Sequence, residues 1–300
     1  MTFAEVEAAR KLYATKRSKT TRICLSIYFV ALFLIILTRN YFFIFHISAL
    51  FLVITVIAIA LTTHKEHADY IKSYKAYFVA ASLAKIFTNI SYNHNSSMPR
   101  EIVQRVMTTA DRYHSNDFMT ATYKNINFAQ ADVHIEEEHT DSDGDKTYVT
   151  IFKGRFLVFD FDRNFTTNLQ VLSRHFAGAR LKHSANHLKF QRIQTESGDF
   201  NKNFRIFAED GVDALYILDP AFMEKIQKLY TDAGHEILLT FIDKKVYIAI
   251  NDGKDSLEPP HSAKKPLDEQ AEIARVQKDI FTITNFVDSL NLDRYFKGKK

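Results

Sequence analysis

Apolar residues are distributed unevenly along this chain, and they are densest between Ile23 and Thr63. Two apolar runs, Ile23–Leu37 and Tyr41–Leu61, lie on either side of Arg39, the single Lys, Arg, Asp or Glu in the stretch. A helix that crosses a bilayer takes about 20 apolar residues. One long helix would place Arg39 at mid-membrane, at a cost of several kcal/mol. We therefore expect a two-helix transmembrane hairpin over residues 23–63, with its turn at Thr38-Arg39-Asn40.

The alternative is a hairpin buried in a soluble core, but such helices rarely come as two adjacent runs without a polar stripe. Basic residues on both outer flanks set the expected orientation, because basic flanks stay on the cytoplasmic side. They are Arg10, Lys11, Lys16, Arg17, Lys19 and Arg22 before the first run, and Lys65, Lys72 and Lys75 after the second. We expect a multi-pass protein of the bacterial inner membrane, with lipids around residues 23–63 and both termini in the cytoplasm.

The segments next to the hairpin have helical periodicity. Residues 1–22 form an amphipathic, basic N-terminus, with apolar residues at helical spacing from Phe3 to Tyr13. This helix would dock on the cytoplasmic domain or lie on the membrane surface. A second helix is expected from His64 to about Ser91, and a third after Pro99, which suits a first helical turn. Residues 64–125 are therefore expected to be a helical stalk.

From residue 126 the pattern alternates with a period of two, which is typical of strands. We expect β-hairpins around Asp141–Asp145 and around Asp243-Lys244-Lys245, and a helix that begins at Asp219-Pro220 and ends at Gly234. Residues 126–256 then form one α+β domain. Residues 257–300 are a Pro-containing loop followed by a C-terminal helix and a basic tail. The fold class is α+β, a transmembrane hairpin followed by a mixed helical and antiparallel β cytoplasmic domain.

Composition excludes several kinds of site. The formal charge of +4 is mild and its excess lies near the two ends, so we expect no nucleic-acid partner. Cys24, the single cysteine, falls in the first apolar run, which rules out an internal disulfide and a thiolate metal cluster. The chain has no Gly-rich phosphate loop, GxSxG elbow or HExxH motif. We therefore expect no cofactor.

Two groups of carboxylates are the candidate binding residues. Asp160 and Asp162 share one face of a strongly apolar strand and would suit acid and base roles. They also fit the place where a strand leaves the core, which is the interpretation we favour. Glu209, Asp210 and Asp213 precede an apolar stretch and would either line a pocket or cap a short helix.

Two further patterns resemble metal sites, but each lacks ligands. The acidic loop Glu136–Asp145 offers alternate carboxylates, yet a calcium loop needs a later Glu where this chain has Phe152. His64 and His67 have a spacing that can bind zinc, without a third ligand nearby in the sequence. We expect a solvated hairpin tip, a surface His pair and no metal.

Two blocks carry a resemblance to a known family. They are Ile151-Phe-Lys-Gly-Arg-Phe-Leu-Val-Phe-Asp-Phe-Asp-Arg-Asn-Phe165 and the segment from Phe200 to Glu224 that contains Ala-Glu-Asp-Gly-Val-Asp. Both blocks, and the two-helix N-terminus, resemble the bacterial DUF3137 family of uncharacterised membrane proteins. The resemblance implies no catalytic residues. It implies a LemA-like membrane protein as a partner, because genes of the two kinds are associated.

These observations together predict a non-enzymatic subunit of a membrane assembly. Its cytoplasmic domain would bind other proteins, either copies of itself or a LemA-like protein. The alternative is an enzyme or ligand sensor at the inner face of the membrane, which would use Asp160, Asp162 or the carboxylates between Glu209 and Asp213.

Overall fold

The computed structural model describes residues 1–37, 43–161, 165–176, 190–260 and 262–290. The chain divides into two compact units. The first contains Met1–Ala81 and Glu258–Arg275, and the second contains Ser82–Leu257 and the chain from Val276 onward. Helix α9 (Glu269–Ser289) begins in the first unit and continues in the second.

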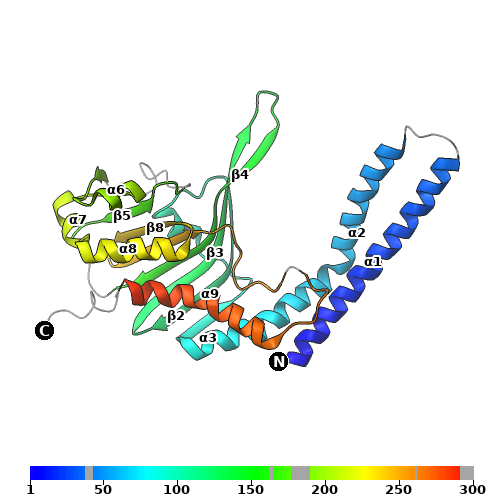
Figure 1. Ribbon diagram of the computed structural model, residues 1–300, viewed down its shortest axis with the longest axis horizontal. Coiled ribbons are helices and arrows are strands. Elements are labelled where there is room, and N and C mark those ends of the chain that lie inside the picture. Colours follow the sequence, from blue (N-terminus) through cyan, green and yellow to red (C-terminus); the bar gives the residue numbers. More distant parts are fainter. Residues whose placement is uncertain (38–42, 162–164, 177–189, 261, 291–300) are drawn as a thin grey trace. The chain divides into compact units, whose positions relative to one another are not determined.

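The first unit is built on two long helices that pair along their length, α1 (Phe3–Leu37) and α2 (Phe43–Tyr74) (Figure 1). Thr20 and Thr62 share a hydrogen bond, as do Tyr28 and Ser48, and the Tyr28 ring stacks on Phe51. The amphipathic N-terminal helix expected within residues 1–22 does not end there, because α1 continues into the apolar run as far as Leu37. No Gly or Pro interrupts the sequence from Thr2 to Leu37.

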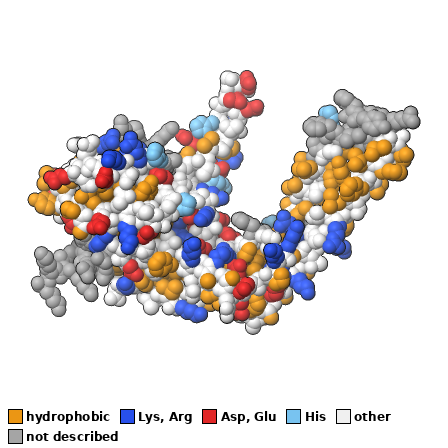
Figure 2. All heavy atoms as spheres, in the orientation of Figure 1, with side chains coloured by type: hydrophobic (Ala, Val, Ile, Leu, Met, Phe, Trp, Pro, Cys, Tyr) orange, Lys and Arg blue, Asp and Glu red, His pale blue; other side chains and the backbone are white. Residues whose placement is uncertain are grey.

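One helical segment among the described residues, His46–Ile86, is long and apolar enough to cross a membrane. Figure 2 shows hydrophobic side chains gathered on the upper part of the two helices, and Lys and Arg side chains lower on the same helices. The first apolar run is helical through Leu37. The predicted turn at residues 38–40 lies outside the described residues.

The other end of the first unit has a packed core. α2 continues as a π-helical turn, η1 (Lys75–Val79), and then as α3 (Ala80–Ile86), which belongs to the second unit from Ser82 onward. Tyr70, Tyr74 and Phe78 are almost fully buried there, as is Val6 of α1. The Tyr74 hydroxyl donates to Glu272 of α9 at 2.6 Å. The N-terminal segment is thus a packed helix in its own unit.

The described residues of the second unit form an antiparallel sheet of nine strands, in the order β1-β2-β3-β4-β9-β8-β5-β7-β6. The strands are β1 (Thr88–Asn93), β2 (Arg112–Tyr123), β3 (Ile126–Thr140), β4 (Lys146–Asp160), β5 (Leu169–Ser173), β6 (Gln191–Ile193), β7 (Phe204–Ala208), β8 (Glu236–Ile242) and β9 (Lys245–Asn251). Both predicted β-hairpins are present, one joining β3 to β4 and the other joining β8 to β9.

The expectation of a helical stalk over residues 64–125 is wrong for β1 and β2. Between them the described helix is the short α4 (Arg100–Gln104), which follows Pro99. β2 escaped prediction because its alternation is weak: Met119 and Ala121 are buried, but so is the charged residue Asp117, at a bulge in the β2–β3 register.

Different elements cover the two faces of the sheet. On one face, Phe222 of α8 (Pro220–Ala233) packs edge-on against Phe241 of β8, and Arg155 of β4 donates to the backbone oxygen of Asp279 in α9. α8 begins at Asp219, whose carboxylate accepts from the Phe222 N–H, and ends at Gly234 in the left-handed conformation, as predicted. On the other face, a core of Met98, Val103 and Val106 covers only part of the sheet.

Candidate functional site

A groove lies on the sheet face that the 98–107 segment leaves partly uncovered. The strand register sets its floor as two rows of side chains. In the first row Thr120, Ala129, Val158 and Tyr247 are successive cross-strand neighbours on β2, β3, β4 and β9. In the second row Thr122 pairs with Asn127, and Asp160 pairs with Lys245. One row is thus mainly apolar and the other is polar.

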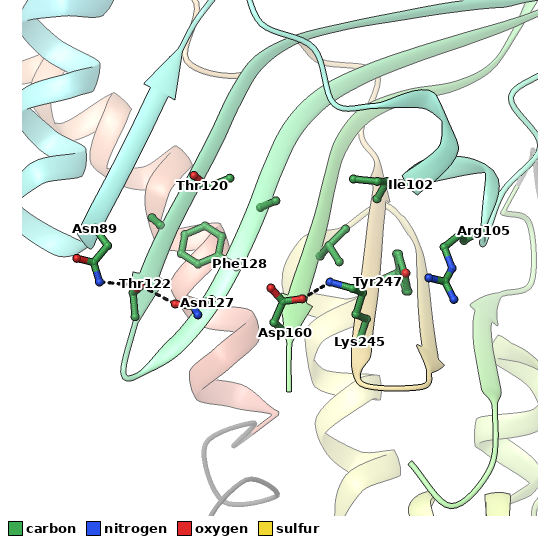
Figure 3. Close-up of a pocket in the computed structure, with 13 residues that line it drawn as sticks. Asn89, Ile102, Arg105, Thr120, Thr122, Asn127, Phe128, Asp160, Lys245 and Tyr247 are labelled. Atoms are coloured by element: carbon green, nitrogen blue, oxygen red, sulfur yellow. Dashed lines mark hydrogen bonds and ion pairs between the residues drawn. The ribbon is translucent and has the colours of Figure 1, made fainter. Parts of the chain in front are cut away.

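The hollow has a steric cause. The next row along the same face contains Ala131, Phe156 and Ala249, and it packs beneath Val103 and Val106. That cover stops at α4. Val158 and Tyr247 of the first row are still buried, whereas Thr120, Ala129 and the second row are partly or fully exposed. The small side chains of Thr120 and Ala129 leave space above the sheet. The resulting cavity has a volume of about 350 Å³ and is closed at one side by Ile102 and Arg105 (Figure 3). This volume lies in the lower part of the range of ligand sites.

Charge is concentrated at one end of the groove. Lys245 Nζ donates to Asp160 Oδ1, and both side chains are about half exposed. Arg105 Nη2 lies 2.8 Å from Asp243 Oδ2. Burial raises the pKa of the Tyr247 phenol, and Asp243 and Asp160 add to that rise while Arg105 opposes it. The Tyr247 hydroxyl is therefore protonated at neutral pH and can donate a hydrogen bond.

The opposite end of the groove is neutral. Asn89 Nδ2 donates to Thr122 Oγ1 at 3.3 Å, and Thr122 Oγ1 donates to Asn127 Oδ1 at 2.7 Å. Figure 3 shows these three side chains on one side of the groove and Arg105, Lys245 and Tyr247 on the other. Among the described lining residues Asp160 is the single carboxylate, and none is His or Cys. The groove therefore suits an organic molecule better than a metal ion.

A second polar group lies on the other face of the same sheet. Asp132 is 3% exposed and accepts from the Ser256 N–H at 2.7 Å, while its Oδ1 atom has no hydrogen-bond partner. Burial raises the pKa of Asp132 well above its usual value, and Asp117 and Asp255 raise it further against the effect of Arg155. Gln130, two residues before Asp132, is buried with both side-chain polar atoms unpaired. Such orphaned groups mark a place that ordered water can fill.

The predicted site residues do not meet in one place. Asp160 lines the groove, and Asp162 lies outside the described residues. Glu209 follows β7 and accepts from Asn168 Nδ2 at 2.9 Å. β4 and β7 are separated by four strand spacings, about 19 Å in all.

Asp210 and Asp213 take the capping roles that the sequence also allowed. Asp210 is the N-cap of α7 (Gly211–Ile217), and its Oδ1 accepts from the N–H groups of Val212 and Asp213. Asp213 stands in the first helical turn, where a negative charge is favourable. Whether these carboxylates also bind a ligand stays a prediction.

The acidic hairpin tip folds on itself. Asp141 Oδ1 accepts from the N–H groups of Asp143 and Asp145, which closes the turn between β3 and β4. Glu138 near the tip pairs with Lys146 at 2.7 Å. The tip thus has the turn geometry expected of a solvated hairpin end.

The sequence pointed to Asp160 but not to its groove partners. Lys245 is 85 positions away and Arg105 belongs to another element. The alternation of β9 already placed Lys245 and Tyr247 on one face. What was missing was the pairing of β4 with β9, which brings that face beside Asp160.

Comparisons with known proteins give a family for about half of the chain. Residues 150–292 match the family described as "Protein of unknown function (DUF3137)", which confirms that resemblance from β4 to the end of α9. Among curated proteins none matches this chain. The crystal structure of the mycobacterial trehalose monomycolate transport factor A, TtfA, is similar at a TM-score of 0.37 and 7% identity, over 73% of this chain and 94% of that one. A likeness at that level carries no argument about fold or function.

Proposed function

Starting from the membership of residues 150–292 in the DUF3137 family, we propose that this chain is a membrane-anchored protein-binding subunit. In this proposal α1 and α2 cross the bacterial inner membrane as a hairpin, and the second unit lies in the cytoplasm. The chain binds a second copy of itself or a LemA-like membrane protein, and it has a structural rather than a catalytic role in the assembly.

The observation that carries the anchor is the exposure of large apolar side chains over the far part of both helices. They are Ile23, Leu25, Ile27, Phe29, Val30, Phe33, Ile36 and Leu37 on α1, and Leu50, Leu52, Val53, Ile54, Val56, Ile57 and Leu61 on α2. A soluble helix hides such residues along one stripe. In a bilayer each Leu, Ile, Phe or Val gains roughly 0.3–0.6 kcal/mol, so each helix gains several kcal/mol.

Helix length and charge support the same arrangement. The helix from Phe43 to Thr63 rises about 31 Å, close to the hydrocarbon thickness of about 30 Å. α1 carries six basic residues between Arg10 and Arg22, before its apolar run. Basic flanks favour the cytoplasmic side, which supports the proposal that both outer ends of the hairpin lie there.

The protein-binding role is supported by an apolar face on α7. Val212, Leu215 and Tyr216 lie at helical spacing, and they are 66%, 42% and 79% exposed. Large apolar side chains that cluster in the open are a common feature of protein interfaces.

Crosslinking in native membranes tests this role. A photoreactive amino acid at Tyr216 should give one discrete crosslinked species, identified by mass spectrometry as a second copy or a LemA-like protein. The same residue at Lys228, an exposed polar position on α8, is the matched control and should give none. A chain that stays monomeric and uncrosslinked from Tyr216 would refute the protein-binding role.

The alternative function is a ligand sensor or enzyme at the inner face of the membrane. The groove with Asp160, Arg105 and Lys245 favours a sensor, because Asp160 is held by an ion pair in the open rather than beside a second carboxylate. A ligand that changes crosslinking from Tyr216 would support this second function.

A further inference from the structure

We infer that the groove on the sheet is a binding site for a small organic anion, a carboxylate on a compact apolar body. The inference concerns the second unit alone and goes beyond the proposed protein-binding role. It rests on the distribution of side chains in the groove, which has a mainly apolar floor and cationic hydrogen-bond donors at one end.

The charge of the lining is the first support. Two cations, Arg105 and Lys245, line the groove together with one carboxylate, Asp160. The aspartate that pairs with Arg105 is Asp243, which lies in the β8–β9 turn outside the lining. With Asp243 counted the four charges cancel, but the lining itself presents two cations against one carboxylate, which favours an anion as the ligand.

The hydrogen-bond inventory is the second support. Lys245 uses one of its three N–H donors on Asp160, and Arg105 uses Nη2 on Asp243. Their remaining donors have no acceptor among the described protein atoms. A carboxylate can accept from these remaining donors without breaking the ion pairs, and such charge-assisted bonds are the strong ones.

The apolar floor of the groove determines what the uncharged part of the ligand must be. Ala129, Ile102 and the largely buried Val158 and Tyr247 make this part of the lining mainly apolar. A volume of about 350 Å³ holds a small molecule and is too small for a two-chain lipid. At the far end Asn89 and Asn127 supply neutral amide groups, so a second charge on the ligand has no partner there.

The occupant could instead be a segment of protein lying along the sheet. The charged end argues against an apolar segment, because covering Arg105 and Lys245 without an acceptor would leave their donors unpaired and desolvated. A small anion satisfies them and leaves both aspartates in water.

The test uses the full-length chain in nanodiscs of neutral phosphatidylcholine, with empty nanodiscs as the reference. The probes are phenylacetate, which has both features, phenylacetamide, which has the body without the charge, and acetate, which has the charge without the body. Calorimetry or ligand-observed NMR gives the affinities. We expect saturable phenylacetate binding with a Kd of about 1 mM or tighter, and binding at least about tenfold weaker for the other two probes.

Matched variants assign that binding to the groove. Lys245→Gln should weaken phenylacetate binding by about tenfold, because it removes one charge-assisted bond. Lys244→Gln, at the exposed neighbouring position in the same turn, should leave it unchanged. Arg105→Gln gives a second, independent loss. Thermal unfolding of each variant verifies that it is folded.

Three results would overturn the inference. The first is the absence of saturable phenylacetate binding. That result would be expected if a second copy, or another segment of the same chain, filled the groove. The second is equal binding of phenylacetamide. The third is an equal effect of Lys244→Gln and Lys245→Gln. None of these results bears on crosslinking from Tyr216, so the inference and the protein-binding role fail separately.

Discussion

Lys245 of β9 donates a hydrogen bond to Asp160 of β4, directly across the register that pairs these two strands. Both side chains are about half exposed, so water screens the pair and its contribution to stability is at most about 1 kcal/mol. Asp160→Asn should therefore change the free energy of unfolding by less than about 1 kcal/mol, as measured by denaturant titration. It should also strengthen phenylacetate binding several-fold, because Asp160 no longer competes for Lys245.

One result would contradict the expected gain in phenylacetate affinity. A loss of phenylacetate affinity in Asp160→Asn would mean that the Asp160 carboxylate itself contacts the ligand, which would favour a cationic or hydrogen-bond-donating ligand instead.

Gly154 is a position where the packing of β4 and β9 admits no side chain. A Cβ atom there would lie 2.0 Å from the backbone oxygen of Ile250, and the residue has a φ of +155°. Gly154→Ala should lower the free energy of unfolding by at least about 3 kcal/mol, because the strands must move apart. Gly198→Ala is the matched control. It meets no atom within 4 Å and should change stability by no more than about 1 kcal/mol. Equal thermal stability of the two variants would contradict the register.

Asp132 should lower the free energy of unfolding in a pH-dependent way. Burial raises its pKa in the folded chain. Below the unfolded pKa of about 3.9 both states carry the proton, and Asp132 has no effect. As the pH rises through that value the unfolded chain loses its proton first, so unfolding becomes easier, and the penalty persists at neutral pH.

The replacement Asp132→Asn removes this penalty and keeps an acceptor for the Ser256 N–H. It should raise Tm by about 2–8 °C at pH 7 and leave Tm unchanged at pH 3, by calorimetry at both values. A variant less stable than the parent at pH 7 would mean that Asp132 is ionised and stabilised by Arg155.

Elements with strong local signals could be predicted from the sequence. Asp219-Pro220 and Gly234 mark both ends of α8 because a cap, a preset φ and a left-handed residue act within a few positions. The β8–β9 hairpin follows from alternation on both sides of one turn. β1 could not be predicted in this way. It is an edge strand with no fully buried residue, so its sequence does not need alternating apolar residues.

The groove could not be predicted in the same way. Asp160 was visible as a charged residue after an apolar strand, but its surroundings depend on contacts far apart in sequence. Arg105 and Lys245 reach it through the order of strands β3, β4 and β9, which periodicity does not encode. The separation of Glu209 from Asp160 follows from that same order.

The apolar surface of α2 should be intolerant of charge where it faces lipid. Leu52 is 65% exposed in the middle of its apolar run. Leu52→Asp should reduce the share of the chain in the carbonate-resistant membrane fraction, because Asp at a mid-membrane position costs roughly 2.5–3.5 kcal/mol, a large part of what α2 gains. Leu12→Asp, at a residue 60% exposed on the basic part of α1, should leave the fraction unchanged. Retention of both variants would mean that Leu52 does not face lipid.

Cysteine accessibility tests most directly whether the helices span the membrane. Cys24 is the single native cysteine, so Cys24→Ala gives a background without thiols. Single cysteines are then placed as Thr2→Cys in the N-terminal segment, Arg39→Cys between the apolar runs and Asp143→Cys at the tip of the β3–β4 hairpin. Intact spheroplasts are treated with a membrane-impermeant maleimide, and a permeabilised sample serves as the control. The account predicts that only Arg39→Cys is labelled in intact spheroplasts and that all three are labelled after permeabilisation. Labelling of Thr2→Cys or Asp143→Cys in intact spheroplasts would contradict it.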